Sequence, residues 1–161
     1  MSNDATPQEP DIKIDKDGVW YYRGAEMFRK DIVNMLYRRL TRDSEGRYLI
    51  EFKNERSYPD VEDTPFVIKA VYRSLSEKGE EVIYLRMPDD SMEKLDPATL
   101  CVGHDNSLYC TIAGSGFEAR FSRAGYYQIA ECIDYEPEND GYYISLDGRR
   151  YYIRKKGETR L

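Results

Sequence analysis

IKIDKDGVWYYRGAEMFRKDIVNMLYRRL, residues 12–40, changes its hydrophobic period halfway along. The first half alternates β-prone and polar residues on both sides of Asp17-Gly18, a dipeptide typical of tight turns, which predicts a β-hairpin. From residue 25, apolar side chains recur at steps of three and four, which predicts an amphipathic helix lying on a sheet. These side chains are Phe28, Ile32, Met35, Leu36 and Leu40. A hairpin running into a helix favours an α+β fold.

The rest of the chain alternates strand-like and turn-like segments. Strands are predicted over 47–52, 65–75 and 81–87, and a loop over 88–98. A hairpin over 99–112 would turn at Asp105-Asn106 and place Cys101 opposite Cys110. A second helix is predicted within 116–133, and a last hairpin turns at Asp147-Gly148. The predicted organisation is a disordered lead-in over 1–11, an N-terminal α+β unit over 12–88 and a C-terminal α+β unit over 89–161.

The first and last predicted hairpins resemble each other. When Gly18 is placed over Gly148, the same residue type recurs at four other pairs: Ile14 and Ile144, Asp17 and Asp147, Tyr21 and Tyr151, Tyr22 and Tyr152. Aromatic-rich hairpins also converge through cross-strand pairing. The residues alone therefore leave both internal duplication and convergence open.

Composition limits the classes of function. The chain has 161 residues and a net charge of -6, which disfavours non-specific DNA binding because that is carried by clustered Lys and Arg. A local basic patch remains at residues 149–161, which hold six of the 24 Lys and Arg. The first fifteen residues lack a basic start and an apolar segment, and no long apolar run follows. We therefore expect a cytoplasmic protein that does not span a membrane.

Common catalytic and metal-binding patterns are missing. His104 is the one histidine, and neither GxGxxG nor GxxxxGK[ST] occurs. Cys101, Cys110 and Cys132 could join His104 around zinc, but their spacing matches no usual site. Buried, reduced thiols are the alternative interpretation. No metal or cofactor is predicted.

Acidic and aromatic residues offer two candidate constellations. Glu51, Glu55, Asp60, Glu62 and Asp63 fall within thirteen positions and could act as a general acid and base pair or as solvated, turn-forming residues. The chain also has 15 tyrosines, with adjacent pairs at 21–22, 126–127, 142–143 and 151–152. Because neighbours in a strand point to opposite faces, one of each pair can pack while the other meets solvent or a flat ligand.

Several of these segments, in this order, resemble the bacterial domain of unknown function 1285 family. They are WYYRG at 20–24, the predicted helix with GRYLI at 46–50, Glu55, VEDTPF at 61–66 and GFEARFSRAGYYQIAE at 116–131. The likeness runs from about Ile12 to Asp134. Two departures are the lack of a proline near Lys53 and the segment RMPDD at 86–90, where the family has an Asn-containing segment. Asn54 and Glu55 also resemble, less closely, a mitochondrial-type family.

The resemblance implies two small similar units, each an antiparallel sheet or partial barrel with a helix, the C-terminal one loosely like a pleckstrin-homology barrel. It also implies a site between the units for a nucleotide-like ligand and a link to signalling, with no established enzymatic activity. Trp20, Arg23, Gly24, Glu55, Asp63, Pro65, Phe66, Glu118 and Arg123 match its motifs.

The leading hypothesis is a non-enzymatic binding module. We expect the ligand to contact Trp20, Tyr22, Arg23, Glu55, Asp63, Phe66, Glu118, Arg123 and Tyr127. Its ring would stack on an aromatic side chain, and Arg23 or Arg123 would hold its anionic group. The alternatives are a hydrolase that uses Glu55 and Asp63, and a protein-interaction module that uses sheet edges or the basic C-terminal segment.

Overall fold

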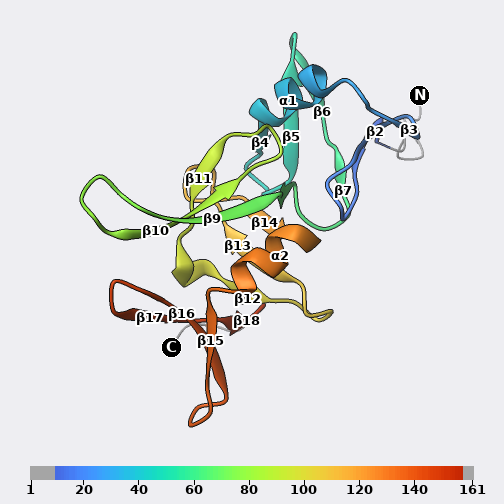
Figure 1. The fold of residues 1–161 in the computed structure, drawn as a ribbon. Helices are drawn as coiled ribbons and strands as arrows, with labels where there is room; N and C mark the ends of the chain where they lie inside the picture. Colours follow the sequence, from blue (N-terminus) through green and yellow to red (C-terminus); the bar gives the residue numbers. More distant parts are fainter. Residues whose placement is uncertain (1–9, 158–161) are drawn as a thin grey trace, which may run out of the picture. The chain divides into compact units, whose positions relative to one another are not determined.

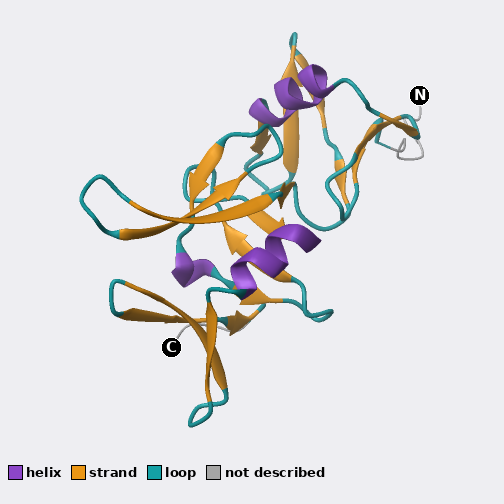
Figure 2. Ribbon diagram, viewed as in Figure 1, coloured by secondary structure: helices purple, strands orange, loops and turns teal. Residues whose placement is uncertain are grey.

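The computed structural model describes residues 10–157, which fall into two compact units, one ending at Asp63 and the other beginning at Thr64. Short strands predominate, and two α-helices accompany them in the described part of the chain (Figures 1 and 2). The α+β class is thus confirmed. The units divide earlier in the chain than the expected boundary after residue 88. Most of the predicted lead-in, residues 1–9, lies outside the described residues, as do residues 158–161.

The N-terminal unit consists of a meander, a helix, a second meander and a closing strand. Its elements are β1 (Ile12–Ile14), β2 (Trp20–Tyr22), β3 (Ala25–Glu26), α1 (Lys30–Arg38), β4 (Leu40–Arg42), β5 (Tyr48–Phe52), β6 (Glu55–Ser57) and β7 (Asp60–Val61). The closing strand β7 returns to pair in parallel with β1. The predicted first hairpin is confirmed, with Ile14 opposite Trp20.

The core of the N-terminal unit forms between α1 and the strands. Ile14, Trp20 and Ile50 are at most 2% exposed, and Leu36 and Tyr37 of α1 are buried. The Trp20 and Tyr37 rings meet edge to face, with centroids 4.8 Å apart. The helix begins at Lys30 rather than near residue 25, because β3 comes first. Phe28, expected on the apolar stripe of the helix, therefore precedes it and is 83% exposed.

The C-terminal unit begins with strands that have no counterpart in the first. These are β8 (Phe66–Ile68), the meander β9 (Ala70–Leu75), β10 (Glu81–Arg86) and β11 (Met92–Lys94), and the 3-10 helix η1 (Pro97–Thr99). The predicted strand over 65–75 is thus two strands that separate at Lys69. The expected loop over 88–98 contains β11, which pairs with β10.

The remainder of the C-terminal unit follows the same order as the N-terminal unit. Its elements are β12 (Cys101–Val102), β13 (Leu108–Thr111), β14 (Glu118–Phe121), α2 (Arg123–Ala130), β15 (Ile133–Glu136), β16 (Gly141–Leu146), β17 (Arg149–Tyr152) and β18 (Arg154–Lys155). The closing strand β18 pairs in parallel with β12, and β8 pairs in parallel with β14. These sheets remain open throughout the described residues. The pleckstrin-homology likeness stays a prediction.

Two expectations in the C-terminal unit were wrong in detail. Cys101 lies opposite Tyr109, not Cys110, because the turn runs from Gly103 to Ser107 rather than over two residues. Cys110 is 1% exposed, and burial raises the pKa of its thiol. The second predicted helix begins only at Arg123, after β14. The Ser122 hydroxyl caps it by accepting a hydrogen bond from the Gly125 N–H.

The shared element order extends to individual hydrogen bonds. In the turn after β1, the Asp15 N–H donates to the Val19 carbonyl; in the turn after β12, the Gly103 N–H donates to the Ser107 carbonyl. Beyond the closing strands, the Glu62 N–H donates to Ile14 and the Lys156 N–H donates to Val102. Both second meanders contain a two-residue turn with positive φ at both positions, Lys53-Asn54 and Asp147-Gly148.

These matched pairs define equivalent positions in the two units. From the first hairpins, Ile14 is equivalent to Val102 and Trp20 to Leu108. From the second meanders, Leu40 and Ile50 are equivalent to Ile133 and Ile144, which places Tyr37 over Ala130. From the closing strands, Asp60 and Val61 are equivalent to Arg154 and Lys155. The hairpin at 12–22 thus occupies the place of 100–110, not that of the 142–152 hairpin it resembles in sequence.

Candidate functional site

An open cleft of about 720 Å³ lies in the C-terminal unit. Helix α2, the β15–β16 hairpin and the strands β12, β13 and β18 supply its lining. Its apolar lining residues are Val102, Leu108, Ala130, Ile133 and Ile153. This volume falls in the range of about 300–1,000 Å³ that small-molecule sites occupy in proteins.

Three tyrosines line the cleft as well. Tyr126 comes from α2, Tyr135 from β15 and Tyr142 from β16, and their side chains are 39–55% exposed. The Tyr135 and Tyr142 rings are tilted against each other, with centroids 5.0 Å apart. Cross-strand pairing sets this contact, because Tyr135 lies directly opposite Tyr142 in the β15–β16 ladder. Aromatic faces of this kind can stack on a flat ligand.

Asp140 fixes the orientation of one of these rings. The Tyr135 hydroxyl donates a hydrogen bond of 2.7 Å to Oδ1 of Asp140, in the turn between β15 and β16. This bond favours the neutral phenol and raises the pKa of Tyr135. Asp140 itself has a φ of 47°, a left-handed conformation that Asp tolerates in turns. The second carboxylate oxygen, Oδ2, can accept from a ligand.

Lys155 of β18 brings a positive charge to the cleft, because it lies beside the cleft residue Val102 in the β12–β18 pair. Arg154 lies beside Cys101 on the opposite face of the strand, where its Nη2 donates a 2.8 Å hydrogen bond to the Ala98 carbonyl. Lys155 is exposed. Asp140 is the one acidic residue among the described residues that line the cleft. An anionic group fits this end of the cleft.

The predicted site residues of the N-terminal unit differ from one another in burial and in their neighbours. Trp20 is 2% exposed and belongs to the core. Tyr22 and Arg23 are exposed, and the guanidinium of Arg23 lies 5.3 Å from the centre of the Tyr22 ring. Arg23 also pairs with Asp11 at 3.3 Å. Asp63 is half-buried at the end of this unit.

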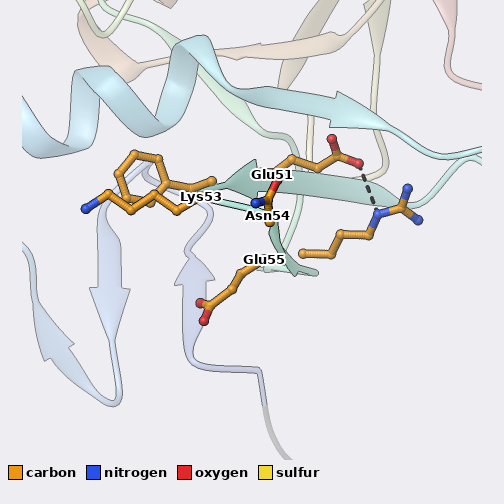
Figure 3. A pocket seen from close by; sticks show the side chains of 6 residues that line it. Glu51, Lys53, Asn54 and Glu55 are labelled. Carbon is orange, nitrogen blue, oxygen red and sulfur yellow. Dashed lines mark ion pairs between the residues drawn. The ribbon is translucent and has the colours of Figure 1, made fainter.

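Glu55 lies next to the two-residue turn of the β5–β6 hairpin (Figure 3). Residues 51–56 line a shallow hollow of about 330 Å³ there. Glu51 pairs with Arg56 at 3.0 Å, and the Glu55 side chain points away from that pair (Figure 3). Glu55 is exposed. The hollow offers little apolar surface for a ligand.

The predicted site residues of the C-terminal unit do not line its cleft. Phe66 packs on Phe117, with ring centroids 5.6 Å apart. Glu118 pairs with Lys156 at 2.8 Å. Arg123 and Tyr127 are exposed one turn apart on α2 and are not among the residues that line the cleft. The adjacent tyrosines at 126–127 and 142–143 and the basic C-terminal segment were the sequence signals that pointed toward the cleft residues.

Among residues 10–157, neither a metal-binding group of side chains nor a helix that could cross a membrane is found. No group of three or more His, Cys, Asp and Glu side chains is arranged there to hold a metal ion. The helices of this part are all too short or too polar to cross a membrane.

Known proteins resemble this chain in structure. Its fold matches that of a DUF1285 family protein from Silicibacter pomeroyi DSS-3, with a TM-score of 0.72 and 19% identity over 92% of this chain and 81% of that one. A DUF1285 family protein from Shewanella baltica OS155 matches with a TM-score of 0.61 and 19% identity over 76% of this chain and 91% of that one. No family sequence profile and no curated protein matches.

The chain therefore has the α+β fold of these DUF1285 family proteins. This confirms, for the fold, the resemblance that its motifs indicate.

Proposed function

We propose that this protein is a non-enzymatic binding module whose C-terminal unit binds a small, anionic, nucleotide-like ligand. The observation that carries the proposal is the composition of the cleft, which combines tyrosine rings, an apolar floor and the basic residue Lys155. Ring faces suit a base, and the Lys155 ammonium suits a phosphate. A ligand of this class needs both groups within one cavity of small-molecule size.

The family resemblance supports the proposal in a general way. We also propose a link to signalling. This part of the proposal requires that the bound nucleotide act as a messenger. The shared hydrogen bonds of the two units also support an internal duplication, which we propose as the origin of the fold. After duplication, one copy can acquire a ligand site while the other keeps a packed core.

A nucleotide-binding screen tests the proposal. We expect a nucleoside monophosphate to raise Tm in a thermal-shift assay, because a ligand that binds the folded state stabilises it. Lys155→Ala should reduce the shift strongly, since it removes an exposed charge at the anion end of the cleft. Arg123→Ala is the matched control, because Arg123 is an exposed cation outside the cleft.

The two variants separate two placements of the site. A shift lost with Lys155→Ala and kept with Arg123→Ala supports the cleft. The reverse result would favour the sequence-based set that includes Arg123. If no nucleotide raises Tm at about 100 times a micromolar Kd, where linkage predicts about 2.7 kcal/mol, the proposed function is wrong.

A further inference from the structure

The cleft has a counterpart position in the N-terminal unit that is filled by side chains. There, Trp20 and Tyr37 occupy the positions equivalent to Leu108 and Ala130, and their rings pack edge to face at 4.8 Å. Both aromatic residues are buried, at 2% and 6% exposure. The C-terminal unit replaces an indole with an isobutyl group and a phenol with a methyl group, so it lacks two rings at this place.

The residues around this place are also more exposed in the C-terminal unit than their equivalents in the N-terminal unit. Ile14 is fully buried, whereas its equivalent Val102 is half-buried. Leu40 is 5% exposed, whereas its equivalent Ile133 is half-buried. Ala130 is itself exposed on α2. The same backbone arrangement therefore surrounds a packed core in one unit and an open, apolar-floored cleft in the other.

Charge at the edge of this place also differs between the units. The closing strand β7 carries Asp60 and Val61, whereas β18 carries Arg154 and Lys155 at the equivalent positions. The C-terminal unit thus combines less aromatic volume at this place with a positive charge, that of Lys155, at its edge. An occupant that restores the packing would bring rings of its own, and an occupant that neutralises the charge would be an anion.

We propose that the cleft takes a fused two-ring aromatic anion, such as a purine nucleotide, in the space that Trp20 and Tyr37 fill in the N-terminal unit. This inference rests on the proposed function and narrows its ligand class. The ring system occupies the place of the missing indole and phenol above Leu108 and Ala130. Its anionic group lies toward Lys155, and Oδ2 of Asp140 accepts from an exocyclic amine or a hydroxyl group.

Calorimetric titration of the full chain with three probes tests the ring class. AMP and indole-3-acetate carry two fused rings and an anion, whereas CMP carries one ring. We expect the two-ring probes to bind, and CMP to bind at least about tenfold more weakly than AMP because it buries less ring surface.

The probes separate failure of this inference from failure of the proposed function. Equal affinity for CMP and AMP would overturn the two-ring inference and leave nucleotide binding standing. Binding of indole-3-acetate alone would keep the two-ring cleft and overturn a nucleotide-like ligand. Absence of binding by all three would overturn both.

A substitution that copies the N-terminal unit tests the location. Ala130→Tyr places at Ala130 the residue found at its equivalent, Tyr37, and we expect it to abolish AMP binding while Tm stays unchanged or rises. Ala124→Tyr is the control, because it adds the same side chain at an exposed position of α2 outside the cleft. Undiminished AMP affinity in Ala130→Tyr would overturn the location.

If the Ala130→Tyr variant folds poorly, an NMR experiment on the unaltered chain tests the location of AMP binding instead. AMP should shift the NMR amide signals of β12, β18 and α2, while the equivalent amides of β1, β7 and α1 stay in place. Shifts confined to the N-terminal unit would overturn the inference.

Discussion

Trp20 shows at the residue scale how tightly the N-terminal core is packed. Its indole is 2% exposed, and its Nε1–H has no hydrogen-bond acceptor among the residues that the structure describes. A buried donor without a partner loses its hydration without compensation. The favourable part of this residue is therefore its ring, which packs on Tyr37.

Trp20→Phe should consequently cost much less stability than Trp20→Ala. The alanine variant removes the ring and is expected to lose about 3–5 kcal/mol of unfolding free energy. The phenylalanine variant keeps a ring and removes the unpaired donor, so we expect a loss of at most about half of that value. Urea unfolding followed by far-UV circular dichroism measures both. Equal losses in the two variants would contradict the conclusion that ring packing is the favourable contribution of this residue.

At the scale of elements, α2 is attached to β9 through a single side chain as well as through packing. The Gln128 side-chain oxygen accepts a 2.7 Å hydrogen bond from the Val71 N–H. Val71 is buried, so its N–H depends on this acceptor. The helix that supplies Tyr126 and Ala130 to the cleft is held in register with the sheet by this bond.

Gln128→Ala should lower the unfolding free energy by about 1–3 kcal/mol, because it leaves a buried donor without a partner. Gln128→Glu keeps a carbonyl-type acceptor at the same distance from the helix and serves as the control. Chemical denaturation of the two variants gives the comparison. If the glutamate variant loses as much as the alanine variant, the bond to Val71 contributes nothing of its own.

The elements also show which parts of the structure the sequence could predict. Hairpin turns at Asp17-Gly18 and Asp147-Gly148 were predictable, because Asp-Gly signals a tight turn locally. The register of β12 and β13 was not predictable, because the turn from Gly103 to Ser107, in which Asn106 has a φ of 62°, shifts the pairing by one residue. Strand β14 was absorbed into the predicted helix, since its burial depends on pairing with β13 and β8.

The cleft was beyond prediction for a different physical reason. The cleft depends on the side chains of Leu108 and Ala130 being smaller than those at the equivalent positions of the N-terminal unit. Nothing in the local sequence around either residue indicates this difference. Only the comparison of these positions with their equivalents Trp20 and Tyr37 reveals the difference in side-chain volume. That equivalence comes from matched hydrogen bonds, whereas the visible sequence echo joins hairpins at different places in the two units.

At the scale of the whole molecule, surface carboxylates respond to acid in a common direction. The pKa values of Asp31, Asp43, Glu81 and Asp105 are all lowered. The main cause is the Arg29 guanidinium for Asp31, the Arg47 N–H for Asp43, Arg73 for Glu81 and a hydrogen bond from Ser107 for Asp105. A lowered folded-state pKa means that ionisation favours the folded state.

We therefore expect Tm to fall as the pH decreases below about 4, the ordinary carboxyl pKa in unfolded chains. The stabilisation is fully present above that value and disappears as the pH passes down through the lowered pKa values. Calorimetric Tm measurements across this range test the direction. Asp43→Asn should show a shallower decrease, because one of the contributing carboxylates is gone. A Tm that rises on acidification would contradict the prediction.

The parallel pairs β1–β7 and β12–β18 have a consequence for synthesis on the ribosome. Each unit is completed only when its closing strand meets its opening strand. The N-terminal unit can do so once Val61 has emerged, before any residue of the second unit is available, because domains generally fold N-terminal first. The C-terminal unit must wait for β18. Since β18 also lines the cleft, the cleft is completed last, by the same event that closes the fold of its unit.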